Sequence, residues 1–409
     1  MNILYIAAEV PFPEGLGGSR RVYETVMNLK KQGHNALALT LGDRDEIVDE
    51  KVFGFKLYRK KFFDILNLYR KFKSRKMTGT LPKSYVEFTQ FNPPQHFSIS
   101  QKLKNILRTE LPINHLIRIM QGLKLVFQII QNEKIDVIIE RNSSYGIGFI
   151  AAKLTHRLYF VDFITIQYWK PTLKYSDGIF AYYVKSQIPR YISHDKVFKV
   201  YTAVNLEKYN SQRNEKFRFS YKIKENEVVV VYVGGMYAWH GLEEIINAVE
   251  ILKEDQIPIK AMIVGYGETF TYIKNLVHQK NLENEIILTG KIPFDDIPNL
   301  LCNCDIALSV NNVGGLGFKN IEYMAAGIPQ ISVNKDILRF FVRHLKEGVL
   351  IDTNDPIEIS NAIKMLIYDP KLRIEIGKNA RIRVEKDYSW EIHIQRILNA
   401  ILVSIKSRK

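Results

Sequence analysis

The chain has few of the features that mark a secreted or membrane-spanning protein. Only two cysteines occur among its 409 residues, and Cys302 and Cys304 precede an apparent strand, which does not suit a disulfide framework. No run of about 18 apolar residues is present, which argues against a transmembrane helix. Residues 1–5 lack the charged region of a signal peptide. These absences favour a cytoplasmic location in a reducing compartment.

Signals for metal and dinucleotide cofactors are missing as well. The nine histidines are scattered without the spacing of metal ligands, and the two cysteines have no histidine partner nearby. The sequence Gly265-Tyr266-Gly267 lacks the third glycine and the later acidic residue of a dinucleotide-binding fingerprint. We therefore expect no metal and no cofactor, and we expect both cysteines to be buried structural thiols.

The length and composition indicate a folded protein of two domains. A single hydrophobic core stops growing at about 250 to 300 residues, and this chain is longer. Hydrophobic residues make up 46% and charged residues 25% of the chain, which is ordinary for a folded enzyme. The formal net charge of +15 implies an anionic partner without saying which one.

The first half of the chain contains a strand–helix–strand unit. An apolar strand over 2–8 is followed by a loop rich in glycine and proline, a helix over 20–32 and a strand over 35–41. This order requires parallel strands and a right-handed crossover. Later strands of the same sheet are predicted over 136–140, 158–165 and 197–202. We therefore predict a first domain at 1–205, with the segment 44–123 as an elaboration outside the core.

The second half repeats this pattern. The strand 228–233 is followed by glycines and a helix over 242–253. Further strands are predicted over 260–264, 285–289 and 305–310. We predict a second domain at 206–387 and an α/β fold of two Rossmann-like parallel-sheet domains. Ligands of such sheets bind beyond the carboxyl ends of the strands, so we expect a site in a cleft between the two domains.

The most informative stretch is residues 314–329, which read GGLGFKNIEYMAAGIP. It follows a predicted strand and places a glycine-rich turn at the start of a helix. Glycines let backbone N–H groups approach a phosphate, and the helix N-terminus adds a favourable dipole. Lys319 and Glu322 are spaced i,i+3, so a cation for phosphate and a carboxylate for sugar hydroxyls share one face. The pattern predicts a nucleotide or a nucleotide sugar as ligand.

Several short motifs, taken in order, resemble those of the retaining glycosyltransferases of the GT-B fold, family 4. They are the loop with Gly17 and Gly18 and residues 234–241, 264–267, 289–293 and 322–329. Residues 388–390 also resemble the closing motif of the family, which starts a last helix, here 388–409, that crosses back to the first domain. The resemblance is strongest over 228–390 and weak over 44–130. It implies a nucleotide-diphosphosugar donor, retention of configuration and no divalent metal.

The chain departs from the family pattern where the family binds phosphate and sugar. Glu322 stands at the second of two expected glutamates, whereas Gly314 stands at the first, which usually touches the donor sugar. The arginine and lysine that clamp the diphosphate in the family fall on Gly235 and His240. We predict that Lys319 replaces one of these cations and that His240 supplies the other when it is protonated.

The resemblance implies roles for individual residues. Glu322, Lys319 and His240 form the predicted catalytic set, in which Glu322 binds the ribose hydroxyls. Lys291 and Ile292 present backbone groups to the base. The predicted contacts to the donor are Gly17, Gly18, Gly235, Lys291, Ile292, Gly314, Gly315, Leu316, Gly317, Lys319 and Glu322.

Two functions of different classes remain open. The first is a glycosyltransferase that moves a sugar from a UDP- or GDP-sugar to a cell-surface glycan or a lipid-linked glycan. The second is a catalytically silent GT-B subunit that binds a partner glycosyltransferase or a glycan, and it is motivated by Gly314, Gly235 and His240. A sugar-nucleotide epimerase needs acidic and histidine catalysts that we do not find. The acceptor contact, expected near Gln167, is unassigned.

Positive charge is concentrated in residues 51–76, which hold ten Lys or Arg residues and a single acid, Asp64. Its apolar residues form one stripe at helical spacing, namely Phe62, Ile65, Leu66, Tyr69 and Phe72. Two interpretations are open: a helix on the anionic inner face of a membrane, or a solvated helix packed on its own domain. Nucleic-acid binding is disfavoured, because no fold signature for groove reading accompanies the charge.

Neutralising the basic residues between Lys56 and Lys76 tests the membrane interpretation. We expect the variant to leave vesicles of anionic phospholipid, because each well-placed cation contributes about 1 kcal/mol to such binding. Cosedimentation with anionic vesicles measures the effect, and neutral vesicles are the control. Unchanged binding to anionic vesicles would contradict the interpretation.

Overall fold

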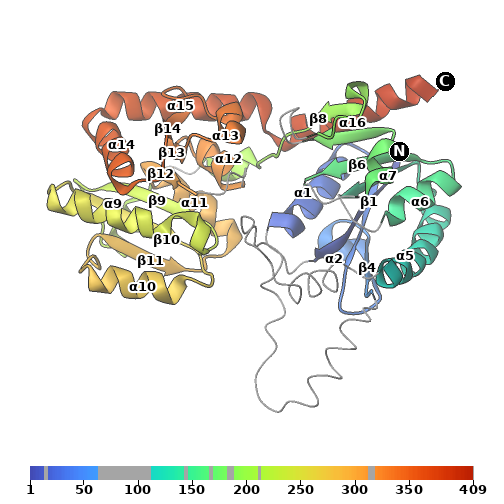
Figure 1. Ribbon diagram of the computed structural model, residues 1–409, viewed down its shortest axis with the longest axis horizontal. Helices are drawn as coiled ribbons and strands as arrows, with labels where there is room; N and C mark the ends of the chain where they lie inside the picture. The colour runs from blue at the N-terminus through green and yellow to red at the C-terminus, as the bar shows by residue number, and fades with distance from the viewer. Residues whose placement is uncertain are drawn as a thin grey trace, which may run out of the picture. The chain divides into compact units, whose positions relative to one another are not determined.

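The computed structural model describes residues 1–12, 17–62, 112–141, 146–164, 169–181, 188–210, 213–311 and 318–408. The chain divides into two compact units (Figure 1). The first unit comprises Met1–Phe180 and Arg190–Val197, and the second comprises Ala181–Pro189 and Phe198–Lys409. Each unit is an α/β structure built on one sheet, which confirms the predicted fold class. The boundary at residue 205 and the path of the last helix stay predictions.

The sheet of the first unit has eight strands in the order β3-β4-β2-β1-β5-β6-β7-β8, and its last strand, β8, crosses the boundary between the units at Val197. Its strands are β1 (Asn2–Pro11), β2 (Asn35–Leu41), β3 (Glu46–Val48), β4 (Leu57–Lys60), β5 (Val137–Arg141), β6 (Leu158–Phe163), β7 (Gly178–Ala181) and β8 (Val197–Lys199). Its helices are α1 (Gly17–Lys31), α2 (Glu50–Phe53), α5 (Pro112–Asn132), α6 (Ile147–Leu154) and α7 (Lys170–Lys174). β1 lies parallel to β2 and β5, whereas β3 at the edge is antiparallel to β4.

The centre of this sheet is buried on both faces. The consecutive residues from Ile3 to Ala8 are each no more than 1% exposed, so both alternating faces of β1 are covered. A parallel strand covered by helices on both sides has no solvent face, which explains the unbroken apolar run. Gly33 follows α1 with a φ of 82°, the left-handed conformation that commonly ends a helix.

One prediction about the first unit is wrong. The segment 44–123 is not wholly an elaboration, because β3 and β4 belong to the main sheet and Phe55 and Leu57 are fully buried. Phe55 packs against the Phe12 ring at a centroid distance of 6.2 Å. The strand was hidden because its apolar residues are interrupted by cations, whose charges made the segment look exposed.

In the part of this segment that the structure describes, Lys56, Arg59 and Lys60 pair with acids of the same unit. Lys56 Nζ lies 2.5 Å from a Glu133 oxygen, and Arg59 lies 3.0 Å from Glu46. The described part of the basic aromatic segment therefore packs on its own unit, with Leu57–Lys60 as a strand rather than a helix. Residues 63–76 lie outside the described residues, so the predicted stripe is not tested.

Glu140 fastens helix α6 to the sheet. Its carboxylate accepts backbone N–H bonds from Gly148 at 3.1 Å and Phe149 at 3.2 Å, and it accepts the Tyr159 hydroxyl at 2.7 Å. Glu140 is only 1% exposed. Burial raises its pKa from 4.5 to about 7, although the hydrogen bonds it accepts favour the charged form.

The raised pKa of Glu140 predicts a pH dependence of stability. The folded state binds the proton more tightly than the unfolded state, so this contribution is complete below the unfolded pKa of 4.5 and is lost as pH rises to about 7. We expect Glu140→Gln, which resembles the protonated form, to gain on the order of 3 kcal/mol relative to the wild type across this window. Urea unfolding at several pH values measures the difference, and a constant difference would contradict the prediction.

The second unit contains a six-stranded parallel sheet in the order β11-β10-β9-β12-β13-β14. Its strands are β9 (Val228–Val233), β10 (Ile259–Val264), β11 (Ile286–Gly290), β12 (Ile306–Ser309), β13 (Gln330–Val333) and β14 (Gly348–Ile351). Its helices are α8 (Glu215–Ser220), α9 (Leu242–Glu254), α10 (Phe270–Gln279), α11 (Ile297–Cys302), α12 (Phe318–Ala325), α13 (Asp336–Phe341), α14 (Pro356–Tyr368), α15 (Pro370–Asp387) and α16 (Trp390–Arg408).

Strand alternation divides the core of this unit into two layers. In β9, Val230 and Tyr232 join a cluster with residues of α9, α10 and α14, whereas Val229 and Val231 join a cluster with residues of α11, α12 and α15. Successive side chains of a strand point to opposite faces, so each layer of helices receives every second residue. The sheet is thus covered on both sides, as Figure 1 also shows.

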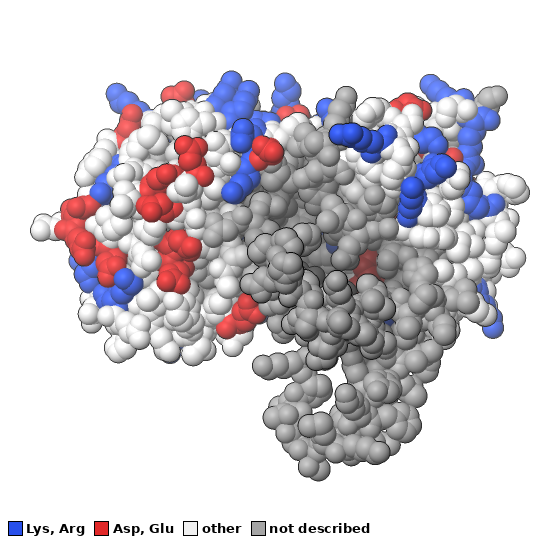
Figure 2. All heavy atoms as spheres, viewed as in Figure 1, with Lys and Arg blue, Asp and Glu red and all other residues white. Residues whose placement is uncertain are grey.

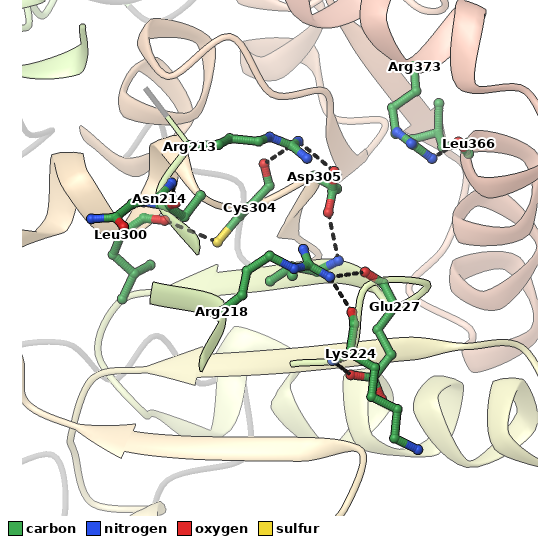
Figure 3. Close-up of polar contacts among 12 residues, drawn as sticks. Arg213, Asn214, Arg218, Lys224, Glu227, Leu300, Cys304, Asp305, Leu366 and Arg373 are labelled. Carbon is green, nitrogen blue, oxygen red and sulfur yellow. Dashed lines mark hydrogen bonds and ion pairs between the residues drawn. The ribbon is translucent and has the colours of Figure 1, made fainter. Parts of the chain in front are cut away.

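Asp305 closes the amino end of this sheet (Figure 3). Its carboxylate accepts the Val229 N–H at 2.8 Å and binds the Arg213 guanidinium at 2.5 Å. In the same loop, Asn303 accepts the Asn214 N–H at 2.6 Å. These bonds attach the segment that enters the unit to the point where β9 and β12 begin their pairing.

Asp305→Ala tests this closure. It leaves the buried Val229 N–H without an acceptor, and we expect a loss of about 2 kcal/mol in the free energy of unfolding. Asp305→Asn is the matched control, because its side-chain oxygen still accepts that N–H, and we expect it to lose less. Urea unfolding measures both variants. Equal losses would show that the bond to Val229 contributes nothing of its own.

The described residues include both cysteines and many helices, which bear on the predictions about disulfides and membrane spans. None of the described helices is long and apolar enough to span a membrane. Neither cysteine forms a disulfide: Cys304 is buried, as predicted, with a thiol pKa raised by burial, whereas Cys302 is partly exposed. On the face shown in Figure 2, acidic side chains gather on the second unit, so the positive net charge is unevenly distributed.

Candidate functional site

The second sheet has a topological switch point beside β9. From β9 the chain moves to β10 and β11 on one side, whereas β12, β13 and β14 lie on the other side. The connections therefore diverge beyond the carboxyl ends of β9 and β12. Open α/β sheets bind ligands at such a point. Here β9 is followed by the loop 234–241, and α12 is the first described helix after β12.

The glycines after β9, β10 and β11 allow three loops to stack on one another. Gly234 donates its N–H to Val264 at 3.0 Å, and Gly265 donates to Gly290 at 2.9 Å. A Cβ at Gly265 would lie 1.8 Å from the carbonyl oxygen of Gly234, which is sterically impossible. At Gly265 a glycine is thus needed for close packing of backbone, a reason that holds with or without a ligand.

His240 is held by the loop that it ends. Its Nδ1 lies 2.5 Å from the Gly235 carbonyl oxygen, which can only accept, so Nδ1 carries a hydrogen and Nε2 is the remaining nitrogen. The Tyr232 hydroxyl donates to the same carbonyl at 2.8 Å. Desolvation lowers the pKa of His240, and the Lys319 cation acts in the same direction, whereas the bond to Gly235 opposes them.

This pKa bears on the predicted role of His240, which requires a protonated ring. The lowered pKa favours a neutral imidazole in the free protein at neutral pH, and the role of His240 as a second cation stays a prediction. A neutral ring whose Nδ1 already donates a hydrogen presents Nε2 as an acceptor. His240 therefore becomes a cation only when an incoming anion supplies the charge that favours its protonation.

Lys319 is the cation that the structure places at the switch point. It lies in the first turn of α12, and its Nζ is 4.6 Å from the centroid of the Tyr232 ring. Desolvation lowers the pKa of Lys319 from 10.5 to about 8. An aromatic face compensates a desolvated ammonium only in part. An anion beside Lys319 would restore the interaction that the cation loses on leaving water.

Helix α12 is fixed at both sides of the switch point. The Tyr323 hydroxyl accepts the Val233 N–H at the end of β9 at 2.9 Å. Asn320 donates to Ser309 at 3.0 Å and to Gln330 at 2.7 Å, which attaches the helix to β12 and β13. These bonds determine where the first turn of α12 presents Lys319.

Glu322 lies one turn after Lys319 on the same helix. Its side chain is buried, with only 4% of the residue exposed. A carboxylate so deep in the protein is retained at a cost unless it has polar partners. Its role at the ribose stays a prediction.

Of the other predicted contacts, some lie in the described part of the chain and others do not. Gly235 is partly exposed beside the Tyr237 ring, which a Cβ would approach to 2.5 Å. Lys291 is exposed and Ile292 is half-buried after β11. Gly17 begins α1 in the first unit, and Gly18 follows it. Gly314, Gly315, Leu316 and Gly317 lie outside the described residues, as does Gln167.

The structure thus brings Lys319 and His240 together around Tyr232, a residue that the sequence analysis did not single out. The only sequence feature that could have pointed to Tyr232 is that it is the one aromatic residue in the strand sequence VVVVYV. Tyr323 and Asn320 were also missed, since their function is to position α12. Among the described residues, no group of three side chains is arranged to hold a metal ion.

Comparison with known proteins identifies the second unit. Residues 213–383 match the family model for glycosyl transferases group 1. The matched residues lie within the second unit. An uncharacterized glycosyltransferase of Methanocaldococcus jannaschii is 30% identical over 47% of this chain and 49% of its own length. In three of the curated relatives that it matches, the chain covers 49%, 55% and 58% of the relative's length, which is about half.

Solved structures resemble the chain over almost its whole length. A glycosyltransferase of Rickettsia africae has a TM-score of 0.72 and 19% identity, covering 99% of this chain and 98% of its own. The Anabaena protein HepE, solved in complex with UDP, has a TM-score of 0.69 and 16% identity, covering 98% of this chain and 100% of its own. These likenesses show the fold, which is GT-B as the sequence predicted.

Proposed function

We propose that the protein is a glycosyltransferase that moves a sugar from a UDP- or GDP-sugar to a glycan or a lipid-linked glycan acceptor. The observation that supports this most directly is the desolvated Lys319 at the switch point of a group 1 domain. A partly compensated cation at a ligand-binding edge suits a diphosphate. HepE, a protein of the same fold, was solved with UDP, which favours a nucleotide at this edge.

The proposed reaction breaks the bond between the anomeric carbon and the diphosphate oxygen. Negative charge then develops on the leaving diphosphate, and Lys319 is in place to stabilise it. The incoming charge also favours protonation of His240, which then donates from Nε2. Glu322 holds the ribose hydroxyls of the donor in this proposal.

We further propose retention of configuration without a metal or a cofactor. The acceptor hydroxyl attacks the face of the sugar from which the diphosphate leaves, and a departing phosphate oxygen takes the hydroxyl proton. The new glycosidic bond forms as the old bond breaks. In this scheme the protein supplies fixed positive charge and orientation rather than a nucleophile.

The competing proposal is a silent subunit that binds a partner glycosyltransferase or a glycan. It is supported by the residues at the family's clamp positions, Gly235 and His240, and by the lowered pKa of His240. Location is likewise a proposal: a cytoplasmic protein that meets its lipid-linked acceptor at the inner membrane face through the basic residues after Lys60.

Calorimetric titration with UDP and GDP separates the two proposals. We expect one nucleotide to bind, and we expect Lys319→Met to weaken it by about tenfold to a hundredfold, the range for a hydrogen bond to a charged group. Affinity of the wild type should fall as pH rises above about 8, where Lys319 loses its proton. The Lys319→Met protein should lack this pH step.

Lys274→Met is the matched control, because Lys274 is an exposed lysine on α10. It should leave the nucleotide affinity unchanged. Glu322→Ala should abolish or greatly weaken binding, since it removes the proposed ribose contact. Absence of binding by the wild type to either nucleotide would favour the silent subunit.

A further inference from the structure

The first unit has a switch point of its own, and charged side chains gather there. The order of its strands reverses beside β1, which lies between β2 and β5. Near the carboxyl ends of the strands lie Glu9 of β1, Glu140 and Arg141 of β5, and Asp162 of β6. No role in the proposed reaction has so far been given to these four residues.

Asp162 is fully engaged within the protein. Its two oxygens accept hydrogen bonds from Arg21 at 3.0 Å and 3.1 Å, and it also accepts the Tyr5 hydroxyl. The side chains of Arg21 and Asp162 are 7% and 3% exposed. A buried pair that satisfies its own hydrogen bonds is structural and leaves little for a ligand.

Arg141 differs from Asp162, because only part of its guanidinium has a partner within the described part of the protein. Its ion-pair partner is Glu9, at 3.6 Å from Nε, which is too long for a good hydrogen bond. Its Nη1 atom is buried and has no hydrogen-bond partner. Buried donors are almost always paired in folded proteins, so an unpaired guanidinium nitrogen calls for an explanation.

Gly18 provides the room beside Arg141. A Cβ built on Gly18 would lie 2.8 Å from Nη1 of Arg141 and 3.5 Å from Nη2. Gly18 lies in helix α1, where its φ is not in the left-handed region and alanine would be the better helix former. The glycine is therefore explained by the space that the guanidinium needs.

The charge of Glu9 neutralises the charge of Arg141 only in part. Desolvation raises the pKa of Glu9 to about 7, with Arg141 opposing and the neighbouring acids Glu140 and Asp162 adding to the rise. Its side chain is still 36% exposed, so it can exchange protons with solvent. Near neutral pH, Glu9 can thus become neutral and leave the charge of Arg141 available.

We propose that Arg141, facing Gly18 and flanked by Glu9, is a binding subsite for an oxyanion of the acceptor, either a carboxylate or a phosphate. This assignment rests on the proposed function. Most predicted donor contacts lie at the switch point of the second unit, and in the first unit only the backbone of Gly17 and Gly18 is predicted to contact the donor, so the Arg141 guanidinium is left for the other substrate. A planar guanidinium with an unpaired nitrogen suits both oxyanions.

Titration with inorganic sulfate at constant ionic strength tests the subsite, because sulfate keeps its charge between pH 6 and 8. Using the Lys319→Met protein removes the cation of the second unit. We expect Arg141→Gln in this background to weaken sulfate binding by about tenfold or more. Glu9→Gln should strengthen binding at pH 8, and affinity with Glu9 present should fall as pH rises through about 7.

Several variants keep the test decisive. Gly18→Ala should weaken sulfate binding, because its methyl group takes the space of the guanidinium, whereas Arg141→Lys should retain part of the affinity. These two variants decide the matter if circular dichroism shows that Arg141→Gln does not fold. Arg44→Gln, which changes an exposed arginine, should have no effect. Sulfate binding that ignores Arg141 and Gly18, or no binding at all, overturns the proposal.

Soluble sugars identify the kind of oxyanion. Displacement of sulfate by glucose 6-phosphate indicates a phosphate, and displacement by glucuronate indicates a carboxylate. Displacement by neutral methyl glucoside as well, or by none of the three, overturns the assignment to the acceptor.

UDP titration of the wild type and of Arg141→Gln distinguishes this failure from failure of the proposed function. Both proteins should bind UDP, or GDP if that is the donor base, with the same affinity. Nucleotide binding without sulfate binding overturns the subsite alone. Sulfate binding at Arg141 without nucleotide binding overturns the acceptor assignment together with the proposed function.

Discussion

Parallel strands place all their carboxyl ends on one edge of a sheet, and the connections diverge where the strand order reverses. This constraint determines where the charged residues of both units gather. In the second unit the reversal lies between β9 and β12, and Lys319 and His240 lie beyond those strands. In the first unit it lies between β1 and β5, and Glu9 and Arg141 lie there. The chain thus carries two charged edges of related geometry.

The desolvated ionisable group is a cation at one edge and a carboxylate at the other. In the second unit a lysine is desolvated against an aromatic ring, and its pKa falls to about 8. In the first unit a carboxylate is desolvated beside an arginine, and its pKa rises to about 7. Both groups are therefore poised to change charge near neutral pH, as groups at functional sites commonly are. By contrast, Asp162 and Asp305 are held by full sets of hydrogen bonds and serve the fold.

Much of the fold was readable from local patterns. The strands 35–41 and 228–233 were predicted at the bounds that the structure has, because each is an apolar run that begins and ends sharply. Helix α9 was predicted to within a residue. The strand β4 was missed, because Lys56, Arg59 and Lys60 interrupt its apolar residues. Only the acids that pair with these cations, Glu133, Glu46 and Asp45, show why the segment can lie in a sheet.

The sequence by itself determined the α/β class and the GT-B fold, and it singled out Lys319 and His240 in the second unit, since these inferences depend on short-range order and spacing. Tertiary structure alone decided what those residues can do. The pKa of His240 is lowered by burial and by the nearby Lys319 cation, against the bond to Gly235, and the pKa of Lys319 is lowered by desolvation. The unpaired nitrogen of Arg141 depends on the space at Gly18, which is far away in the sequence. Desolvation and through-space charge depend on distances that no local pattern encodes.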